Sequence, residues 1–159
     1  MPNMNIRAAT ISDIPGMLPL LEQLGYPASL HEAERRFKDF VSLKGYGVAV
    51  ACISDKVIGW VAWSKTQVFI SDNTRFHIEG LVVDEQHRGQ GIGKQLMTFV
   101  EDYAKGFHPC IIDLTSGLRR AKDGSHEFYK ALGYHNEGLM AKLYLRKELS
   151  VQQVAAQMS

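Results

Sequence analysis

Apolar side chains recur every three or four positions in several stretches of the chain, which predicts amphipathic helices. The first helix follows a cap at Ser12 or Asp13 and ends at Gly25. The second begins at Ser29 and ends near Leu43. A third helix follows a glycine-rich stretch and carries its apolar side chains at Ile92, Leu96, Val100 and Tyr103.

Other stretches are nearly continuous apolar runs or alternate in polarity, which predicts strands. A hairpin is expected where Ser54-Asp55-Lys56 separates two such runs. The last two runs are expected to form a final strand pair. The expected strands cover residues 4–10, 46–53, 57–69, 75–83, 110–115, 134–137 and 142–148. With a short helix before the last pair, the element order is β-α-α-β-β-β-α-β-α-β-β.

Length and composition predict one globular domain, expected over residues 1–150, with residues 151–159 as a tail. The formal net charge of +1 argues against nucleic-acid binding, which needs a basic surface. No apolar run is long enough to span a membrane and no signal peptide is visible, so a cytoplasmic protein without a membrane partner is expected. Cys52 and Cys110 lie in apolar runs and are interpreted as buried thiols in a reducing compartment.

The stretch Arg88-Gly89-Gln90-Gly91-Ile92-Gly93 joins the apolar run that ends at Val83 to the third predicted helix. The first amides of a helix lack intrahelical acceptors, and glycines let a ligand approach the backbone. Such a turn is suited to bind phosphate oxygens. A P-loop is excluded because Gln95 stands where a hydroxyl would hold Mg²⁺, and the Rossmann fingerprint fails because Lys94 stands at its sixth position.

A third phosphate-binding pattern, Arg/Gln-x-x-Gly-x-Gly/Ala, fits these six residues at every position. The stretch resembles the acetyl-CoA pyrophosphate loop of the GNAT superfamily of N-acetyltransferases. A second motif, Phe128-Tyr129-x-x-x-Gly133-Tyr134, resembles the family's Phe-Tyr-x-x-x-Gly-Phe segment at the family's usual separation. It lies on the short predicted helix, which Asp123 or Ser125 caps. Together with the element order, the resemblance covers residues 4–149.

The resemblance implies the GNAT fold, an α/β (α+β) architecture whose central sheet is mixed, mostly antiparallel and splayed, with about seven strands flanked by about four helices. It also implies acetyl-CoA as co-substrate and no metal. In the family the pantetheine arm pairs with the fourth strand, and the pyrophosphate meets the amides of the glycine-rich loop. The cofactor-binding residues that carry over are Leu81, Val82, Val83, Arg88, Gly89, Gln90, Gly91, Ile92, Gly93, Lys94 and Ser125.

The sequence departs from the family pattern at one place before the second motif. The family often has Asn-x-x-Ala there, and the Asn contacts the cofactor. Lys122 and Ser125 occupy those two positions here. Whether Lys122, Ser116, Arg119 or Arg120 takes over the contact of the Asn stays open.

The implied reaction transfers an acetyl group from a thioester to a primary amine by direct attack in a ternary complex. An alkylamine with a pKa of about 10.4 is neutral to only about one part in 10³ at pH 7, so a base has a task. The leaving thiolate needs a proton, so an acid has one too. Tyr129 matches the family's tyrosine near the CoA sulfur and is the predicted general acid, because a phenol stays protonated at pH 7. The alternative is that Tyr129 is a core aromatic residue whose hydroxyl donates a hydrogen bond to a backbone carbonyl.

Glu79 is the predicted general base, acting through a water. It lies in an apolar strand, where a carboxylate is costly unless it has a task or a partner. Strand alternation places it on the same face as Leu81 and Val83. An ion pair with Arg75 or Lys65 is the alternative interpretation.

The acceptor amine is not encoded in these motifs. Small amines, amino acids, polyamines, aminoglycosides and protein N-termini or lysines stay open, as does a homodimer. Candidates for lining the acceptor pocket, each with a purely structural role as the alternative, are Tyr26, His31, Trp63, Asp72, His77 and His126. The alternative function is a catalytically idle module that senses CoA and binds a protein partner; a pocket carboxylate and Tyr129 favour the enzyme.

Overall fold

The computed structural model describes residues 3–116 and 124–150, and the chain divides into two compact units, residues 1–114 and 115–159. The first unit holds a five-stranded sheet in the order β1-β2-β3-β4-β5. Its strands are β1 (Met4–Ala8), β2 (Gly47–Ile53), β3 (Lys56–Gln67), β4 (Thr74–Val83) and β5 (Cys110–Leu114). Neighbouring strands are antiparallel except β4 and β5, which are parallel. The predicted mixed, mostly antiparallel sheet is therefore confirmed.

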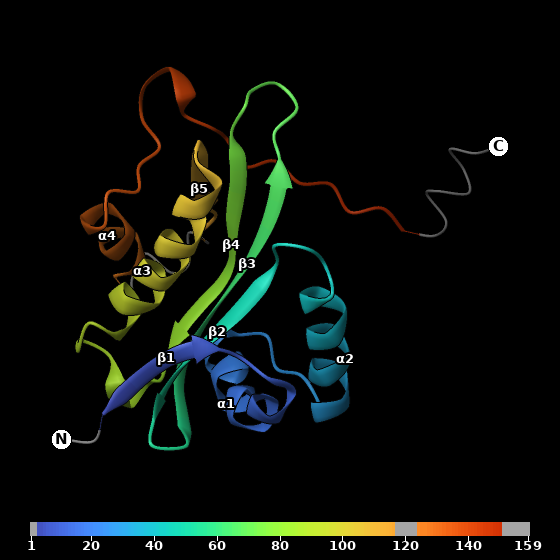
Figure 1. Cartoon of the computed structure of the whole chain (residues 1–159), viewed down its shortest axis with the longest axis vertical. Helices are drawn as coiled ribbons and strands as arrows, with labels where there is room; N and C mark the ends of the chain where they lie inside the picture. Colours follow the sequence, from blue (N-terminus) through green and yellow to red (C-terminus); the bar gives the residue numbers. More distant parts are fainter. Residues whose placement is uncertain (1–2, 117–123, 151–159) are drawn as a thin grey trace. The chain divides into compact units, whose positions relative to one another are not determined.

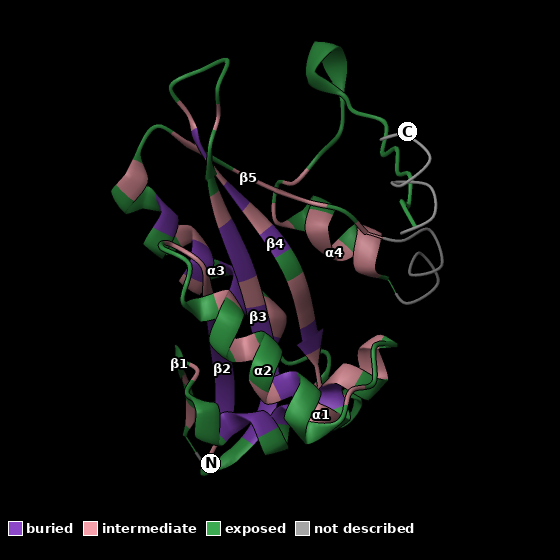
Figure 2. Cartoon of the chain, turned by 90° about the vertical axis from the view of Figure 1, so that its right-hand side faces the viewer, coloured by how far each residue is buried: buried purple, intermediate pink, exposed green. Residues whose placement is uncertain are grey.

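Helices cover both faces of this sheet. Figure 1 shows α1 (Ile14–Leu24) and α2 (Leu30–Val41) on one side and α3 (Ile92–Ala104) on the other. The buried side chains concentrate along β2 and β3 (Figure 2), between the two helical layers. Burying apolar area on both faces is the main force that holds such a three-layer arrangement together.

The two faces have different cores. On the α1 side, Met17 and Leu20 pack against Trp60 in one buried cluster. On the α3 side, the ring of Phe76 meets Tyr103 edge-on at a centroid distance of 5.9 Å, and Leu96 is fully buried. The spacing of apolar residues that predicted α3 is confirmed, because the apolar face of this helix packs on the sheet.

The helix boundaries follow local signals in the sequence. Ser29 caps α2 by accepting a hydrogen bond from the amide of Glu32 at 3.2 Å. Gly25 ends α1 with a φ of 100°, a conformation that favours glycine. No described helix is both long and apolar enough to cross a membrane.

The predicted final strand pair is wrong. Residues 134–150 contain no strand, only a short 3-10 turn over Gly138–Met140. The apolar side chains of Leu139, Leu143 and Leu145 are 104%, 80% and 80% exposed, so the alternating pattern has found no neighbouring strand to pack on. The described sheet has five strands where about seven were expected.

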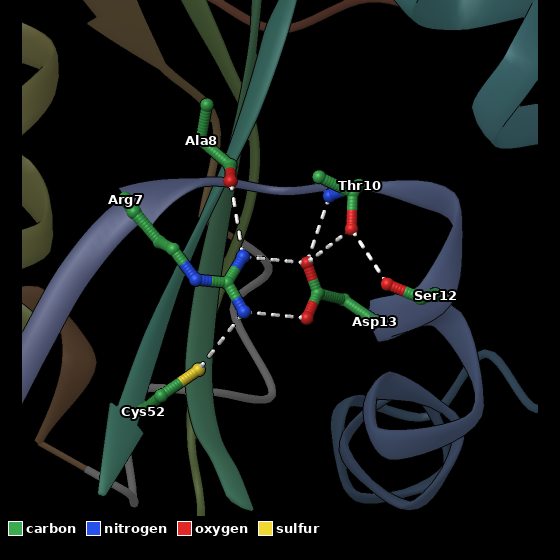
Figure 3. A network of polar contacts seen from close by, with 6 residues as sticks. All are labelled: Arg7, Ala8, Thr10, Ser12, Asp13 and Cys52. Atoms are coloured by element: carbon green, nitrogen blue, oxygen red, sulfur yellow. Dashed lines mark hydrogen bonds and ion pairs between the residues drawn. The ribbon is translucent and has the colours of Figure 1, made fainter. Parts of the chain in front are cut away.

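An ion pair fixes the connection from β1 to α1 (Figure 3). Both guanidinium NH₂ groups of Arg7 donate to the carboxylate of Asp13, at 2.7 and 2.8 Å, and the amide of Thr10 donates to the same carboxylate at 2.7 Å. These hydrogen bonds hold the pKa of Asp13 below its usual range, although burial opposes them. Arg7 also reaches the sulfur of Cys52 at 3.8 Å.

The two cysteines differ in environment. Cys52 is buried, and burial raises the pKa of its thiol, which agrees with the predicted buried thiol. Cys110 is only half-buried at the start of β5, so the prediction of a buried thiol is wrong for it.

Candidate active site

The glycine-rich stretch forms an open loop between β4 and α3. Gly89 and Gly91 have φ values of +78° and +79°, and an added Cβ at either position would meet nothing within 4 Å. Backbone conformation, and not close packing, is therefore the reason for glycine at both positions. Gly91 is the N-cap of α3, and no side chain accepts a hydrogen bond from the first amides of this helix. Such amides at a helix N-terminus are suited to bind an anion.

A side chain from α1 holds the base of this loop. Gln23 donates to Asp84 at 3.0 Å and accepts from the amide of Glu85 at 3.0 Å. The ring of His87 lies 2.9 Å from the other oxygen of Asp84. The hydrogen bond from Gln23, then that from His87, lowers the pKa of Asp84 against the opposing effect of burial. The sequence contains no signal for this tether, because Gln23 and Asp84 are 61 residues apart.

The edge of β4 beside the loop is open. Pairing between β4 and β5 ends at Ile78 and Leu114, whereas β4 continues to Val83. Over these last residues, Leu81 to Val83, β4 pairs with β3 on its other side and with no described strand on this one. Backbone donors and acceptors at such an edge are suited to pair with an amide-bearing ligand.

A β-bulge sits at Glu79. Ala62 pairs with Gly80 and Trp63 with Ile78, so Glu79 is the extra residue of β4. The bulge reverses the alternation beyond it. Ser64, which follows Trp63, donates a hydrogen bond to the Glu79 carboxylate at 2.7 Å.

The bulge corrects two expectations about Glu79. Ser64 lies two residues after Ala62 in β3, so both side chains are on the same face, where Ala62 packs in the α1 core. Leu81 pairs with Val61, which is on the α3 side. Glu79 therefore shares its face with Ser64 and not with Leu81 and Val83, as strict alternation predicted. The side chain is also exposed and not buried in an apolar strand.

The predicted alternative partners of Glu79 are engaged elsewhere. Arg75 donates to Asp113 of β5 through Nε at 2.6 Å. The ammonium group of Lys65 lies 4.4 Å above the ring of Phe107. The hydrogen bond described for the Glu79 carboxylate comes instead from Ser64.

His77 joins the pair of Arg75 and Asp113 on the same face of the sheet. Its Nδ1 lies 2.6 Å from Asp113 Oδ1 and 3.1 Å from the guanidinium of Arg75. Ser64 is the cross-strand partner of His77, so the Ser64–Glu79 contact adjoins this cluster. Sequence reasoning singled out His77 and Glu79 but missed Ser64 and Asp113.

The second unit carries Tyr129 on α4 (Ser125–Ala131). The rings of Phe128 and Tyr134 pack against it at centroid distances of 5.1 and 6.2 Å. The amide of Tyr134 donates to the carbonyl of Tyr129 at 3.0 Å, which closes the helix around Gly133. The motif therefore builds a helix end that fixes the Tyr129 ring.

The predicted cap of α4 is wrong. Gly124 is the N-cap, with a φ of 76°, and Ser125 is the first helical residue without a side-chain cap. Positive φ strongly favours glycine over Ser at that position. The other candidate cap, Asp123, lies outside the described residues, as do three candidates for the Asn contact, Arg119, Arg120 and Lys122.

Three further acceptor candidates lie on different elements of the first unit. Trp63 is 5% exposed, packs against Phe99 and Tyr103 on the α3 side, and donates its indole N–H to the Gly45 carbonyl. It is a core residue on the face of the sheet opposite Glu79. His31 and Asp72 are exposed on α2 and in the β3–β4 turn.

Known proteins share this sequence pattern and fold. Residues 14–134 match the model of the Acetyltransferase (GNAT) family. The chain belongs to this GNAT family. The match spans most of the chain, and it includes both the glycine-rich loop and the segment around Tyr129.

Individual relatives agree with the family assignment. The GNAT chain is 28% identical over 151 residues to glucosamine 6-phosphate N-acetyltransferase of Arabidopsis thaliana, covering 87% of this chain and 95% of that one. The crystal structure of the Arabidopsis enzyme has a TM-score of 0.73 at 25% identity, covering 91% and 99% of the two chains. An aminoglycoside N-acetyltransferase solved in complex with CoA has a TM-score of 0.77 at 16% identity, covering 92% and 96%, which shows a shared fold.

Proposed function

We propose that this GNAT protein is an acetyl-CoA-dependent N-acetyltransferase that moves an acetyl group to a primary amine by direct attack in a ternary complex. The observation that carries the proposal is the open backbone edge of β4, which leads directly into the uncapped loop before α3. An amide-bearing arm followed by a pyrophosphate matches these two features in order.

The residues of the first unit fit acetyl-CoA. The edge over Leu81, Val82 and Val83 pairs with no described strand, although the Val83 carbonyl accepts a hydrogen bond from Arg88 Nε at 3.2 Å. At the start of α3, no side chain caps the first amides. Arg88 and Lys94 are exposed cations at the two ends of that loop. Ser125 is proposed as a further contact on its match to the family motif. When bound, acetyl-CoA supplies an acetyl group activated as a thioester.

Glu79 is proposed as the general base that takes a proton from the amine through a water. Its exposed carboxylate stands at the bulge where β4 and β5 have just stopped pairing, and Ser64 orients one of its oxygens. Making the amine neutral costs about 4 kcal/mol at pH 7, and a positioned base can raise the rate by about 10²–10⁴-fold.

Tyr129 is proposed as the general acid that protonates the leaving thiolate. The proposal rests on its match to the family's Phe-Tyr segment and on the chemistry of a phenol, which keeps its proton at pH 7. The packed rings of Phe128 and Tyr134 restrict its rotamers.

Amino sugars are the first acceptors to test. The names of the relatives include glucosamine 6-phosphate and aminoglycosides, both of which carry primary amines on sugar rings. Amino acids, polyamines and peptide amines complete the range of chemically competent acceptors.

Turnover of acetyl-CoA with a panel of these amines tests the proposal. We expect at least one amine to yield free thiol and acetylated amine in equal amounts, at a rate well above the reaction without protein. Tight binding of CoA with no turnover across the panel would instead support the catalytically idle module.

A further inference from the structure

Two protons leave the amine in this reaction, so a second proton acceptor has a task. An amine that binds as an ammonium loses two protons on its way to an amide. One is lost before the nitrogen attacks, and the other as the new C–N bond makes the nitrogen acidic. Glu79 accounts for the first. Under the proposed function, on which this inference rests, the second proton still lacks an acceptor.

The cluster of Arg75, His77 and Asp113 lies beside Glu79 on the same face. His77 and Asp113 are directly opposite each other on parallel strands, one pair before β4 and β5 separate. Ser64 links the two groups, because it pairs with His77 across β3 and β4 and donates to the Glu79 carboxylate. Two basic side chains therefore flank one serine.

The contacts of His77 determine which ring nitrogen can act. Asp113 Oδ1, which can only accept, lies 2.6 Å from Nδ1, closer than the donor-only guanidinium of Arg75 at 3.1 Å, so we assign the proton of the neutral ring to Nδ1. Nε2 then keeps its lone pair. The imidazole side chain is 21% exposed, which leaves it within reach of a ligand on this face. This is the arrangement in which a carboxylate orients a histidine base and stabilises its charged form.

Arg75 and Asp113 bring opposite charges to the same ring nitrogen, Nδ1. The described charged groups that face His77 from its own strand are Arg75 and Glu79, and β5 adds Asp113. At this position β3 contributes the neutral Ser64.

We propose that His77 is a second catalytic base, which takes the second proton from the acceptor nitrogen. The nitrogen forms its bond to the acetyl carbon, the C–S bond breaks with its electron pair on sulfur, and the sulfur takes up one proton to leave as free thiol. The proton released from the nitrogen passes to His77 Nε2 and then to solvent. Asp113 is a positioning residue that orients the ring and stabilises the imidazolium.

The first test is the tautomer of His77, which needs no turnover. Long-range ¹H–¹⁵N spectra of the full chain should show neutral His77 with its proton on Nδ1. A neutral ring with its proton on Nε2 would overturn the proposal, since that nitrogen could then not accept a proton.

The second test is the pH profile of kcat with an amine that the panel identifies. We expect His77→Gln to lower kcat by about 10²-fold and to remove one ionisation from the acid limb. His108→Gln changes an exposed histidine before β5 and should leave both unchanged. The remaining activity of His77→Gln can still depend on Glu79.

Variants of the two neighbours separate a catalytic role from a structural one. Asp113→Asn should lower kcat and let the neutral ring carry its proton on Nε2, because no carboxylate then holds that proton on Nδ1, whereas Arg75→Gln should leave it on Nδ1. If His77 only ties β4 to β5, these variants would change thermal stability and leave kcat unchanged, which would contradict the proposal. Absence of turnover by the wild type with every amine would contradict the proposed function instead.

Discussion

Two Arg–Asp pairs connect neighbouring elements of this protein, and their surroundings differ. Arg7 and Asp13 join β1 to α1, and the Asp13 side chain is 8% exposed and bound by Arg7 and by the Thr10 amide. Arg75 and Asp113 join β4 to β5, and the Asp113 side chain is 42% exposed. The first carboxylate is closed off from ligands, whereas the second lies on an open face beside His77 and Glu79.

The difference separates structure from chemistry. A buried carboxylate whose oxygens are bound stabilises the fold and has no capacity left for a substrate. An exposed pair contributes little to stability, because solvent screens it, but its side chains can reach a ligand. We therefore expect the Asp13 network to control stability and the Asp113 face to control activity.

The largest expected effect is on folding. Asp13→Ala should lower the free energy of unfolding by about 3 kcal/mol, because Arg7 and the Thr10 amide lose a partner at a mostly buried site. Asp113→Ala should lower it by less than about 1 kcal/mol. Urea unfolding of both variants measures the two changes. Equal losses of unfolding free energy would contradict the proposed difference between the Asp13 and Asp113 pairs.

On the open face, Glu79→Gln should lower kcat/KM by about 10²-fold and remove one ionisation from its acid limb, because the amide cannot accept a proton. Stability should stay near that of the wild type, since the side chain is exposed. Glu101→Gln, on α3 at the opposite face, is the matched control. An intact pH dependence in Glu79→Gln would place the base elsewhere.

A smaller effect is expected at Tyr129. Tyr129→Phe keeps the ring that packs on Phe128 and removes the proton, so kcat should fall by about 10-fold with little change in CoA affinity. Tyr144→Phe, at an exposed position, should have no effect. Wild-type kcat in Tyr129→Phe would mean that the thiolate leaves without this acid.

The smallest effect is the pH dependence of the stability that the Arg7–Asp13 pair contributes. The pKa of Asp13 is lower in the folded chain than its usual value of 3.8, so its ionisation adds stability above that value. This contribution is lost as pH falls through the lowered pKa. The stability difference between wild type and Asp13→Asn should therefore be constant from about pH 5 to 7 and shrink below about pH 4. Thermal unfolding measured across this range would show it, and a difference that grows toward low pH would contradict the assignment.

The parts of the fold that could be predicted depend on local signals. The cap at Ser29, the stop at Gly25 and the glycine-rich loop are each encoded within a few residues. The same holds for the helix end that Gly133 forms after Tyr129.

The parts that could not be predicted depend on pairing between distant residues. The bulge at Glu79 arises from the register of β4 on β3, which no local pattern encodes. His77 meets Asp113 across 36 residues. The run 142–148 has the alternation of a strand, but alternation alone does not supply a partner.

The central claim is that the loop before α3 holds acetyl-CoA, and calorimetry with CoA tests it most directly. Replacing both Gly91 and Gly93 with Val should abolish measurable binding, because the added side chains cover the amides that would meet the phosphates. Gly138→Val introduces similar strain, at a φ of +72° in the second unit, and should bind like the wild type. Unchanged CoA affinity in the folded double variant would contradict the account.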